Sequence, residues 1–216
     1  QKLFFMKKKL FYLLIVIFIS FKAISLEVTL TQGTIKPTPI AITDFFSNEN
    51  KTKKIGKNIS IVISDNLERS GLFLPLDKKS FIQNNESLSK QIRFEDWKII
   101  KSQYLLSGSI RLIDNKILVS FKLYDILSQK VLEDLSFKPA SEKAWRRISH
   151  YISDIIFQKI TGESGYFDSR IVYIAETGSK ENRQKRLAIM DQDGHNHKFL
   201  SDGSYLVLTP RFSPNS

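Results

Sequence analysis

Two short stretches of the sequence contain side chains that could bind a metal, and both are better explained as turns. His195, Asn196 and His197 place two imidazoles two residues apart, but a metal site needs several ligands that converge from different elements. The stretch 191–194 (DQDG) begins like a calcium loop, yet its glycine comes too early and no glutamate closes the loop. We therefore predict no metal site and no bound cofactor.

Catalytic motifs are also missing from the sequence. It contains neither a glycine-rich phosphate loop nor the Gly-x-Ser-x-Gly turn of a nucleophilic serine. Of the 3 histidines, His150 lies in a predicted helix whose neighbours offer no obvious acid–base partner. The charged run 180–186 is typical of a solvated loop between strands. We predict that the chain is not an enzyme.

The N-terminal residues have the three-part layout of a secretory signal peptide. A basic start at 6–9 (MKKK) precedes the apolar run 10–21, and Ala23 and Ser25 then fit the small-residue cleavage rule. Residues 1–5 precede the predicted initiator Met6 and are interpreted as upstream sequence. An uncleaved membrane anchor is the alternative, but a spanning helix needs about 20 apolar residues. We predict cleavage near Ser25 and no stable membrane insertion afterwards.

Loss of the signal changes how the charge of the chain is interpreted. The full sequence has a formal charge of +11, but removing five lysines with residues 1–25 leaves 28 basic and 22 acidic side chains, a charge of +6. A nucleic-acid partner is therefore not expected, and a basic surface-binding protein is a distant hypothesis. The chain has no cysteine, and an exported protein of this kind is typical of a bacterial periplasm.

Residues 26–162 predict an α/β (α+β) domain with helices packed on a mixed sheet. Helix 55–67 is indicated by apolar residues at a spacing of four, and Pro75 places its strand at an edge or an end. Trp97 and Trp145 are predicted to pack in or beside the core. The predicted strands are 39–43, 72–76, 104–112, 116–126 and 130–137, the last three forming an antiparallel meander; residues 77–90 are predicted as loop, and 94–100 and 144–160 as helices.

The pattern changes after a predicted linker at 162–168. Strands are expected at 170–175 and 186–190, with a tight Asp-Gly turn after them and a third strand at 197–200. These strands and the 209–215 turn (TPRFSPN) are typical of one blade of a repeat propeller. One blade cannot bury both of its faces, so we expect the chain to be truncated within the first blade.

Several short motifs follow one another in a specific order along the chain. They are LEV at 26–28, PIAI at 39–42, DNLERSGLFLPLD at 65–77, FEDW at 94–97, SG at 107–108, YD at 124–125, FQKITG at 157–162, FDSRIVYI at 167–174 and the turn at 191–194. Their order resembles the TolB family, periplasmic components of the Tol-Pal system. The resemblance covers the whole chain from the signal onward.

The resemblance implies an N-terminal α/β domain followed by a six-bladed β-propeller, without enzymatic activity. It also implies two protein partners: the propeller binds the lipoprotein Pal, and the mature N-terminal segment binds the inner-membrane protein TolA. The family maintains the outer membrane, supports constriction during cell division and is exploited by colicins. No Pal-binding residue can be assigned, because that surface lies in later blades.

By this resemblance the TolA-binding arm maps onto Leu26, Glu27, Val28, Thr29, Leu30 and Thr31. A short β-prone arm can add a strand to a partner's sheet through backbone hydrogen bonds; from the residues alone, an ordinary strand of the host domain is the alternative. Residues 32–38 depart from the family's acidic, glycine-rich spacer.

An alternative function for the chain is the N-terminal part of an exported propeller-containing peptidase. The predicted domains are 1–25, 26–162 and 163–216.

Overall fold

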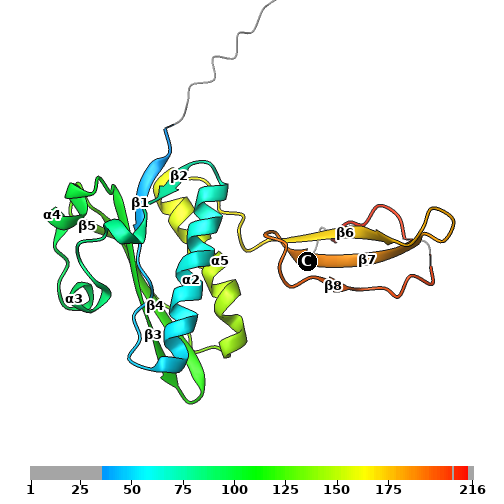
Figure 1. The fold of residues 1–216 in the computed structure, drawn as a ribbon, viewed down its shortest axis with the longest axis horizontal. Coiled ribbons are helices and arrows are strands. Elements are labelled where there is room, and N and C mark those ends of the chain that lie inside the picture. Colours follow the sequence, from blue (N-terminus) through cyan, green and yellow to red (C-terminus); the bar gives the residue numbers. More distant parts are fainter. Residues whose placement is uncertain (1–35, 206, 214–216) are drawn as a thin grey trace, which may run out of the picture. The chain divides into compact units, whose positions relative to one another are not determined.

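A computed structural model describes residues 36–205 and 207–213 of the chain (Figure 1). The first sheet has five strands in the order β2-β1-β3-β4-β5, and the second has three in the order β6-β7-β8. The strands are β1 (Thr38–Ile42), β2 (Phe73–Pro75), β3 (Tyr104–Ile113), β4 (Lys116–Asp125), β5 (Lys130–Ser136), β6 (Arg170–Thr177), β7 (Gln184–Asp191) and β8 (Lys198–Phe199). The helices are α2 (Asn50–Arg69), α3 (Asn85–Lys90), α4 (Phe94–Ile99) and α5 (Trp145–Thr161), with short 3₁₀ turns at Lys78–Ser80 and Glu142–Ala144.

The five-stranded sheet is mixed, as predicted. Strand β1 pairs in parallel with both β2 and β3, and β3, β4 and β5 form an antiparallel meander. Parallel neighbours require a crossover connection, which α2 supplies between β1 and β2. Pro75 pairs with Ile40 at the outer strand β2, where its missing N–H costs no ladder bond on the open side.

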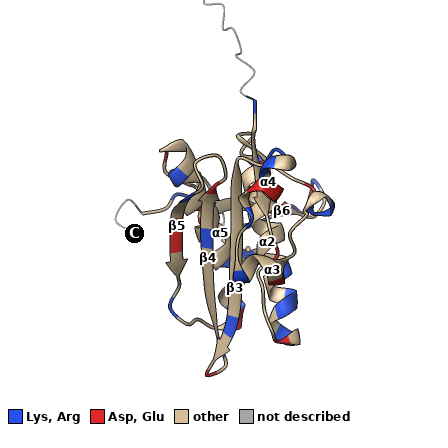
Figure 2. Cartoon of the chain, turned by 90° about the vertical axis from the view of Figure 1, so that its left-hand side faces the viewer, with Lys and Arg blue, Asp and Glu red and all other residues tan. Residues whose placement is uncertain are grey.

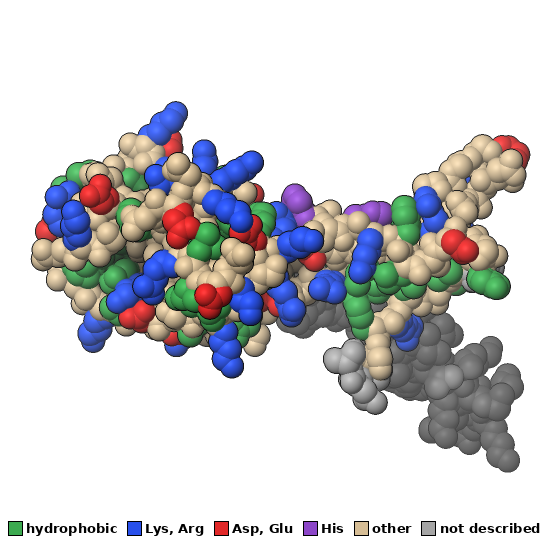
Figure 3. All heavy atoms as spheres, turned by 90° about the horizontal axis from the view of Figure 1, so that it is seen from below, with side chains coloured by type: hydrophobic (Ala, Val, Ile, Leu, Met, Phe, Trp, Pro, Cys, Tyr) green, Lys and Arg blue, Asp and Glu red, His purple; other side chains and the backbone are tan. Residues whose placement is uncertain are grey.

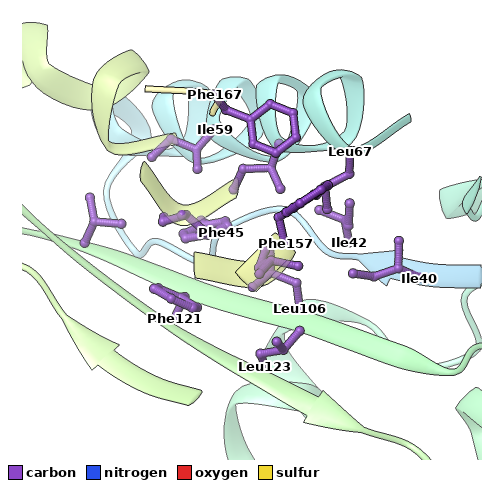
Figure 4. Close-up of a cluster of buried hydrophobic side chains, with 14 of the residues drawn as sticks. Ile40, Ile42, Phe45, Ile59, Leu67, Leu106, Phe121, Leu123, Phe157 and Phe167 are labelled. Atoms are coloured by element: carbon purple, nitrogen blue, oxygen red, sulfur yellow. The ribbon is translucent and has the colours of Figure 1, made fainter. Parts of the chain in front are cut away.

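The main core lies between this sheet and the two long helices. Figure 4 shows Ile59 and Leu67 of α2 and Phe157 of α5 pointing toward the side chains of β1, β3 and β4. The helices α2 and α5 pack against each other on one face of the sheet (Figure 1). The spacing of four in α2 predicted this face because residues four apart lie one above the other on a helix.

A second cluster covers the other face of the same sheet. Ala41 and Leu105 belong to it, whereas their neighbours Ile40 and Leu106 belong to the main core, because successive strand residues point to opposite faces. Trp97 of α4 is fully buried in this second cluster, and its Nε1–H donates to Gln83 Oε1 at 3.2 Å. The prediction that Trp97 is a core residue is confirmed.

The prediction of a continuous loop at 77–90 is wrong, because this stretch contains α3. The polar composition of the segment concealed two determinants of the helix. Asn84 caps its first turn by accepting the Ser87 N–H at 2.8 Å, and Leu88 is buried in the second cluster with Trp97. One buried leucine on a short polar helix is too little for a periodic signal.

Helix α5 ends where the sequence predicted. Gly162 follows it with φ of +80°, a left-handed conformation that favours glycine. The three-stranded sheet follows, with β6 pairing antiparallel to β7 and β7 to β8. The predicted turn after β7 is present: the Gly194 N–H donates to Asp191 O at 2.9 Å, and the Asp191 N–H to His195 O at 2.8 Å.

Charged residues of both signs are interspersed over the described surface. Figure 2 shows basic (blue) and acidic (red) segments scattered over the strands and the helices, and Figure 3 shows basic and acidic side chains mixed over the face seen there. Within the described residues, none of the helices has the length and apolar character that crossing a bilayer requires.

Candidate protein-interaction sites

The residues predicted to bind TolA and those predicted for signal cleavage lie outside the described residues. The description begins at Lys36, directly before β1. The start of β1 is paired on both sides, since the Thr38 N–H donates to Leu72 O at 2.9 Å and the Gln103 N–H to Pro39 O at 3.0 Å. Strand β1 is therefore an inner strand that is hydrogen-bonded on both sides at its start.

The predicted linker after α5 is docked against that helix. Phe167 is fully buried in the main core. Asp154 of α5 accepts the backbone N–H of Phe167 at 2.6 Å with Oδ1 and that of Asp168 at 3.0 Å with Oδ2. Burial raises the pKa of the Asp154 carboxyl above its usual value, although both N–H donors work to lower it. The segment is thus an anchored connection between the two sheets.

The turn after β7 touches α5 through a buried ion pair. The Asp193 carboxylate, whose side chain is only 4% exposed, pairs with the Arg146 guanidinium. Burial works to raise the pKa of Asp193, but the His195 N–H and the Arg146 guanidinium outweigh it and hold the pKa below its usual value. Asp193 therefore stays ionised at neutral pH and binds the turn to α5.

A second contact of the same turn reaches α2 through Asn66. The Asn66 Oδ1 accepts a hydrogen bond from Gln192 Nε2 at 3.1 Å and one from Arg69 at 2.7 Å. The Asn66 Nδ2 lies 2.9 Å from His150 Nδ1 and donates to Ser153 Oγ at 3.0 Å. Every hydrogen-bonding position of this buried amide is filled. The turn network is defined as Asn66, Arg146, His150, Gln192 and Asp193.

Sequence reasoning missed the turn network. It described His150 as lacking a partner and the 191–194 stretch as a turn alone. One signal was available: Asn66 lies on the apolar face of α2 between Ile63 and Leu67, and a buried amide on such a face requires hydrogen-bond partners. Its partner Gln192 is 126 residues away, however, so no local pattern could have identified it.

Three side chains of this region approach as metal ligands do. Donor atoms of His150, Asp191 and Asp193 lie within 4.8 Å of one another. Arg146 already supplies the positive charge to Asp193, and Asn196 Nδ2 donates to Asp191 at 2.5 Å. These contacts fit an intramolecular ion pair better than a site for a cation.

The two neighbouring histidines of the sequence do not converge on one point. His195 Nδ1 lies 3.4 Å from Asp193 Oδ1, whereas the His197 ring makes an edge contact with Phe199, with 4.8 Å between the ring centroids. His197 also lies beside Tyr173, with centroids 6.0 Å apart. Their different surroundings give them no shared catalytic or metal-binding function.

An open hollow of about 440 Å³ lies over β3 and β4 beside α3. Ser107, Ser109 and Ser120 are among the residues that line it, together with Lys122 and Asp134. The hollow contains hydroxyl groups, but none of the 3 histidines of the chain lines it. It lacks the imidazole base that would activate a serine nucleophile.

Comparison with known proteins covers both sheets. The family model described as the TolB amino-terminal domain matches residues 26–132, and the one described as the TolB beta propeller domain matches residues 157–216. The chain belongs to the TolB family. The five-stranded sheet with its helices is the amino-terminal region of this family, and β6, β7 and β8 are strands of its propeller.

Two relatives named Tol-Pal system protein TolB support this assignment. That of Paramagnetospirillum magneticum is 50% identical over 191 residues, which cover 88% of this chain and 42% of the relative. That of Pelagibacter ubique is 46% identical over 210 residues, 93% of this chain and 47% of the relative. The chain spans about half the length of these TolB relatives.

A solved structure agrees with the sequence comparisons. The crystal structure of TolB from Acinetobacter baumannii matches with a TM-score of 0.65 at 27% identity, over 76% of this chain and 38% of that one. The TolB fold therefore accounts for the succession of a helix-covered mixed sheet and an antiparallel sheet.

Proposed function

We propose that this chain is the TolA-facing half of a non-enzymatic periplasmic scaffold of the Tol-Pal system. The scaffold would link inner-membrane TolA to outer-membrane Pal, and so support outer-membrane integrity and constriction during division. The observation that carries the proposal is the match to both TolB modules in order, along one chain whose relatives are named Tol-Pal system proteins.

The described side chains support a binding function over catalysis. His150 is enclosed between α2, α5 and the turn after β7, where its Nδ1 is held by Asn66. The serines of the open hollow have no imidazole beside them. The described residues thus offer surfaces and anchored contacts but no nucleophile with an adjacent base.

The arm formed by Leu26, Glu27, Val28, Thr29, Leu30 and Thr31 is the proposed TolA-binding element. Its alternating β-prone residues suit the addition of a strand to an exposed sheet edge, where backbone hydrogen bonds supply affinity. The arm leads into β1, an inner strand of the sheet. A load applied by TolA would therefore be borne by a strand that is hydrogen-bonded on both sides.

Capture by the periplasmic C-terminal domain of TolA tests the arm. Full-length protein should be retained on immobilised TolA domain, and replacing residues 26–31 by a Gly-Ser sequence of equal length should abolish retention. The replacement preserves chain length, so its effect reports the arm sequence and not a shortened tether. Equal retention of the replaced protein would exclude the arm as the TolA-binding element.

Single proline substitutions test strand addition specifically. Val28→Pro and Thr29→Pro each remove one backbone N–H, and adjacent N–H groups of a strand face opposite edges. We expect at least one of them to weaken TolA binding by about tenfold, the equivalent of about 1.4 kcal/mol. Val28→Ala and Thr29→Ala are the matched controls that retain the N–H. Side-chain recognition would instead make the alanine variants as weak as the proline variants.

Export is tested by sequencing the N-terminus of protein recovered from the periplasm. The proposed cleavage near Ser25 gives a mature chain that starts at about Leu26. Ala23→Leu combined with Ser25→Leu should leave the signal attached, because bulky residues do not fit the small-residue cleavage rule. Recovery of unprocessed wild-type protein in the membrane fraction would favour the anchor interpretation.

A further inference from the structure

His150 is enclosed by charged groups from every element around it. Its side chain is 3% exposed, and Nε2 has no hydrogen-bond partner among the described residues. The charged and titratable groups that surround it are Arg146 and Asp154 on its own helix, Arg69 on α2 through Asn66, Asp168 in the segment after α5, and Asp191, Asp193 and His195 around the turn after β7.

The hydrogen bonds of Asn66 determine which nitrogen of His150 carries the proton. Arg69 and Gln192 both donate to Asn66 Oδ1, and Ser153 Oγ–H donates to Ser149 O at 2.9 Å, so Oγ accepts from Asn66 Nδ2. The amide NH₂ therefore faces His150 Nδ1, which must accept. In the neutral ring the proton then resides on Nε2.

The opposite side of the ring faces a carboxylate. His150 Nε2 lies 3.5 Å from Asp193 Oδ2, beyond an ordinary hydrogen bond, and Arg146 pairs with that same oxygen. The neutral ring is thus fixed by α2 through Asn66 and only loosely engaged with the turn. A second proton would add a charge next to Asp193 and place an N–H donor against the Asn66 NH₂.

We propose that His150 is a proton-sensitive latch in the turn network: its protonation releases the contact between α2 and the turn after β7, and adds a second contact from α5 beside the Arg146–Asp193 pair. Protonated His150 cannot accept from Asn66, so the Asn66 amide must turn its Oδ1 toward the ring. That rotation withdraws Oδ1 from Gln192 and Arg69. The imidazolium simultaneously gains an ion pair with Asp193.

Burial places the operating range of the latch below the pH at which an ordinary histidine titrates. Desolvation, the largest influence, lowers the pKa of His150 below its usual 6.5; Asp193 works in the opposite direction, and Arg146 adds to the lowering. His150 is therefore neutral at pH 7, and the Asn66–Gln192 contact is intact there. The latch concerns the connection between the two sheets and does not depend on which partners the protein binds.

Isotope labelling of the histidine, asparagine and glutamine side chains of the full-length protein tests the latch by NMR. Loss of one signal in His150→Gln assigns the His150 resonance. We expect the Nε2–H tautomer at pH 7.5, and we expect the side-chain amide signals of Asn66 and Gln192 to shift with the His150 midpoint as the pH falls. Gln at position 150 retains an acceptor for Asn66, so this variant should preserve the neutral-pH arrangement.

Two comparisons make the result specific. The Gln192 titration should disappear in His150→Gln and persist in His195→Gln, which removes the exposed neighbouring imidazole. A Gln192 signal that stays constant through the His150 midpoint would overturn the latch. So would an Nδ1–H tautomer at neutral pH, or a Gln192 titration that survives in His150→Gln.

Discussion

The two sheets of the chain differ in how far they bury their own apolar residues. The five-stranded sheet has a hydrophobic cluster on each face and fully buried residues in β1, β3 and β4. Among the described strands of the three-stranded sheet, Ala188 is the one hydrophobic residue that is buried. Ile171 and Phe199 of its strands remain exposed, as do Leu200, Leu208 and Phe212 in the segment that follows β8.

This difference reflects two ways of completing a core. The first sheet is covered by helices from its own segment, as an independent α/β layer arrangement requires. Among the residues that the structure describes, no helix covers the second sheet, and it exposes side chains that a neighbouring blade would cover in a repeat architecture. The chain spans about half the length of its TolB relatives.

The largest expected effect comes from truncating the core of the first sheet. Phe121→Ala removes a fully buried ring and should lower the free energy of unfolding by about 3–5 kcal/mol.

Phe199→Ala is the matched change in the second sheet, where this residue is 42% exposed. In a chain of residues 26–216 it should cost under about 1 kcal/mol, and more in the full-length protein. Denaturant unfolding of each variant and of the wild type of the same length measures these costs. Equal costs for Phe199→Ala in both lengths would contradict the comparison of the two sheets.

The next effect concerns the ion pair that joins the sheets. Arg146→Leu leaves the buried Asp193 carboxylate unpaired and should cost about 3 kcal/mol. The adjacent Arg147→Leu is the control, because its 3.2 Å pair with Asp168 has an arginine that is 73% exposed, and such pairs contribute under about 1 kcal/mol. Thermal unfolding compares the stability of the two variants. Similar losses of stability would show that the buried Arg146 pair stabilises the protein no more than the exposed Arg147 pair.

A smaller effect is expected where the connecting segment is anchored. Asp154→Ala leaves the N–H groups of Phe167 and Asp168 without their acceptors, which should cost about 1–3 kcal/mol. The segment should then open locally, and chymotrypsin should cleave after Tyr166 or Phe167 faster than in the wild type. Asp134→Asn, in an exposed ion pair with Lys122, is the control. Unchanged cleavage in Asp154→Ala would contradict the anchoring.

The smallest effect is a pH dependence of stability due to His150. Its pKa in the folded protein is held below the usual 6.5, so the unfolded chain takes up the proton first as the pH falls. The contribution of neutral His150 is fully present above pH 6.5 and is lost as the pH falls through the folded pKa. Chemical denaturation between pH 7.5 and about 5 should show this slope in wild type, and a reduced slope in His150→Gln. An unchanged slope in His150→Gln would show that other titrating groups cause the pH dependence of stability.

The same contrast explains what the sequence could predict. Helices α2 and α5 and the β3–β4–β5 meander have strong local periodicity and were predicted, although α2 begins at Asn50, five residues before the predicted helix 55–67. Helix α3 was missed, because Asn84 and Leu88 form no repeating pattern. The docking of Phe167 and the Asn66–Gln192 contact were missed because they depend on residues brought together only by the fold. The residues 26–31 of the arm lie outside the described structure, so their function stays a prediction.

Simultaneous binding of both partners tests the scaffold account most directly. Full-length protein loaded on immobilised Pal should retain the C-terminal domain of TolA from solution. The variant with residues 26–31 replaced by a Gly-Ser sequence should still bind Pal but retain no TolA domain. Failure of the wild-type protein to bind Pal, or retention of TolA by the replaced variant, would contradict the account.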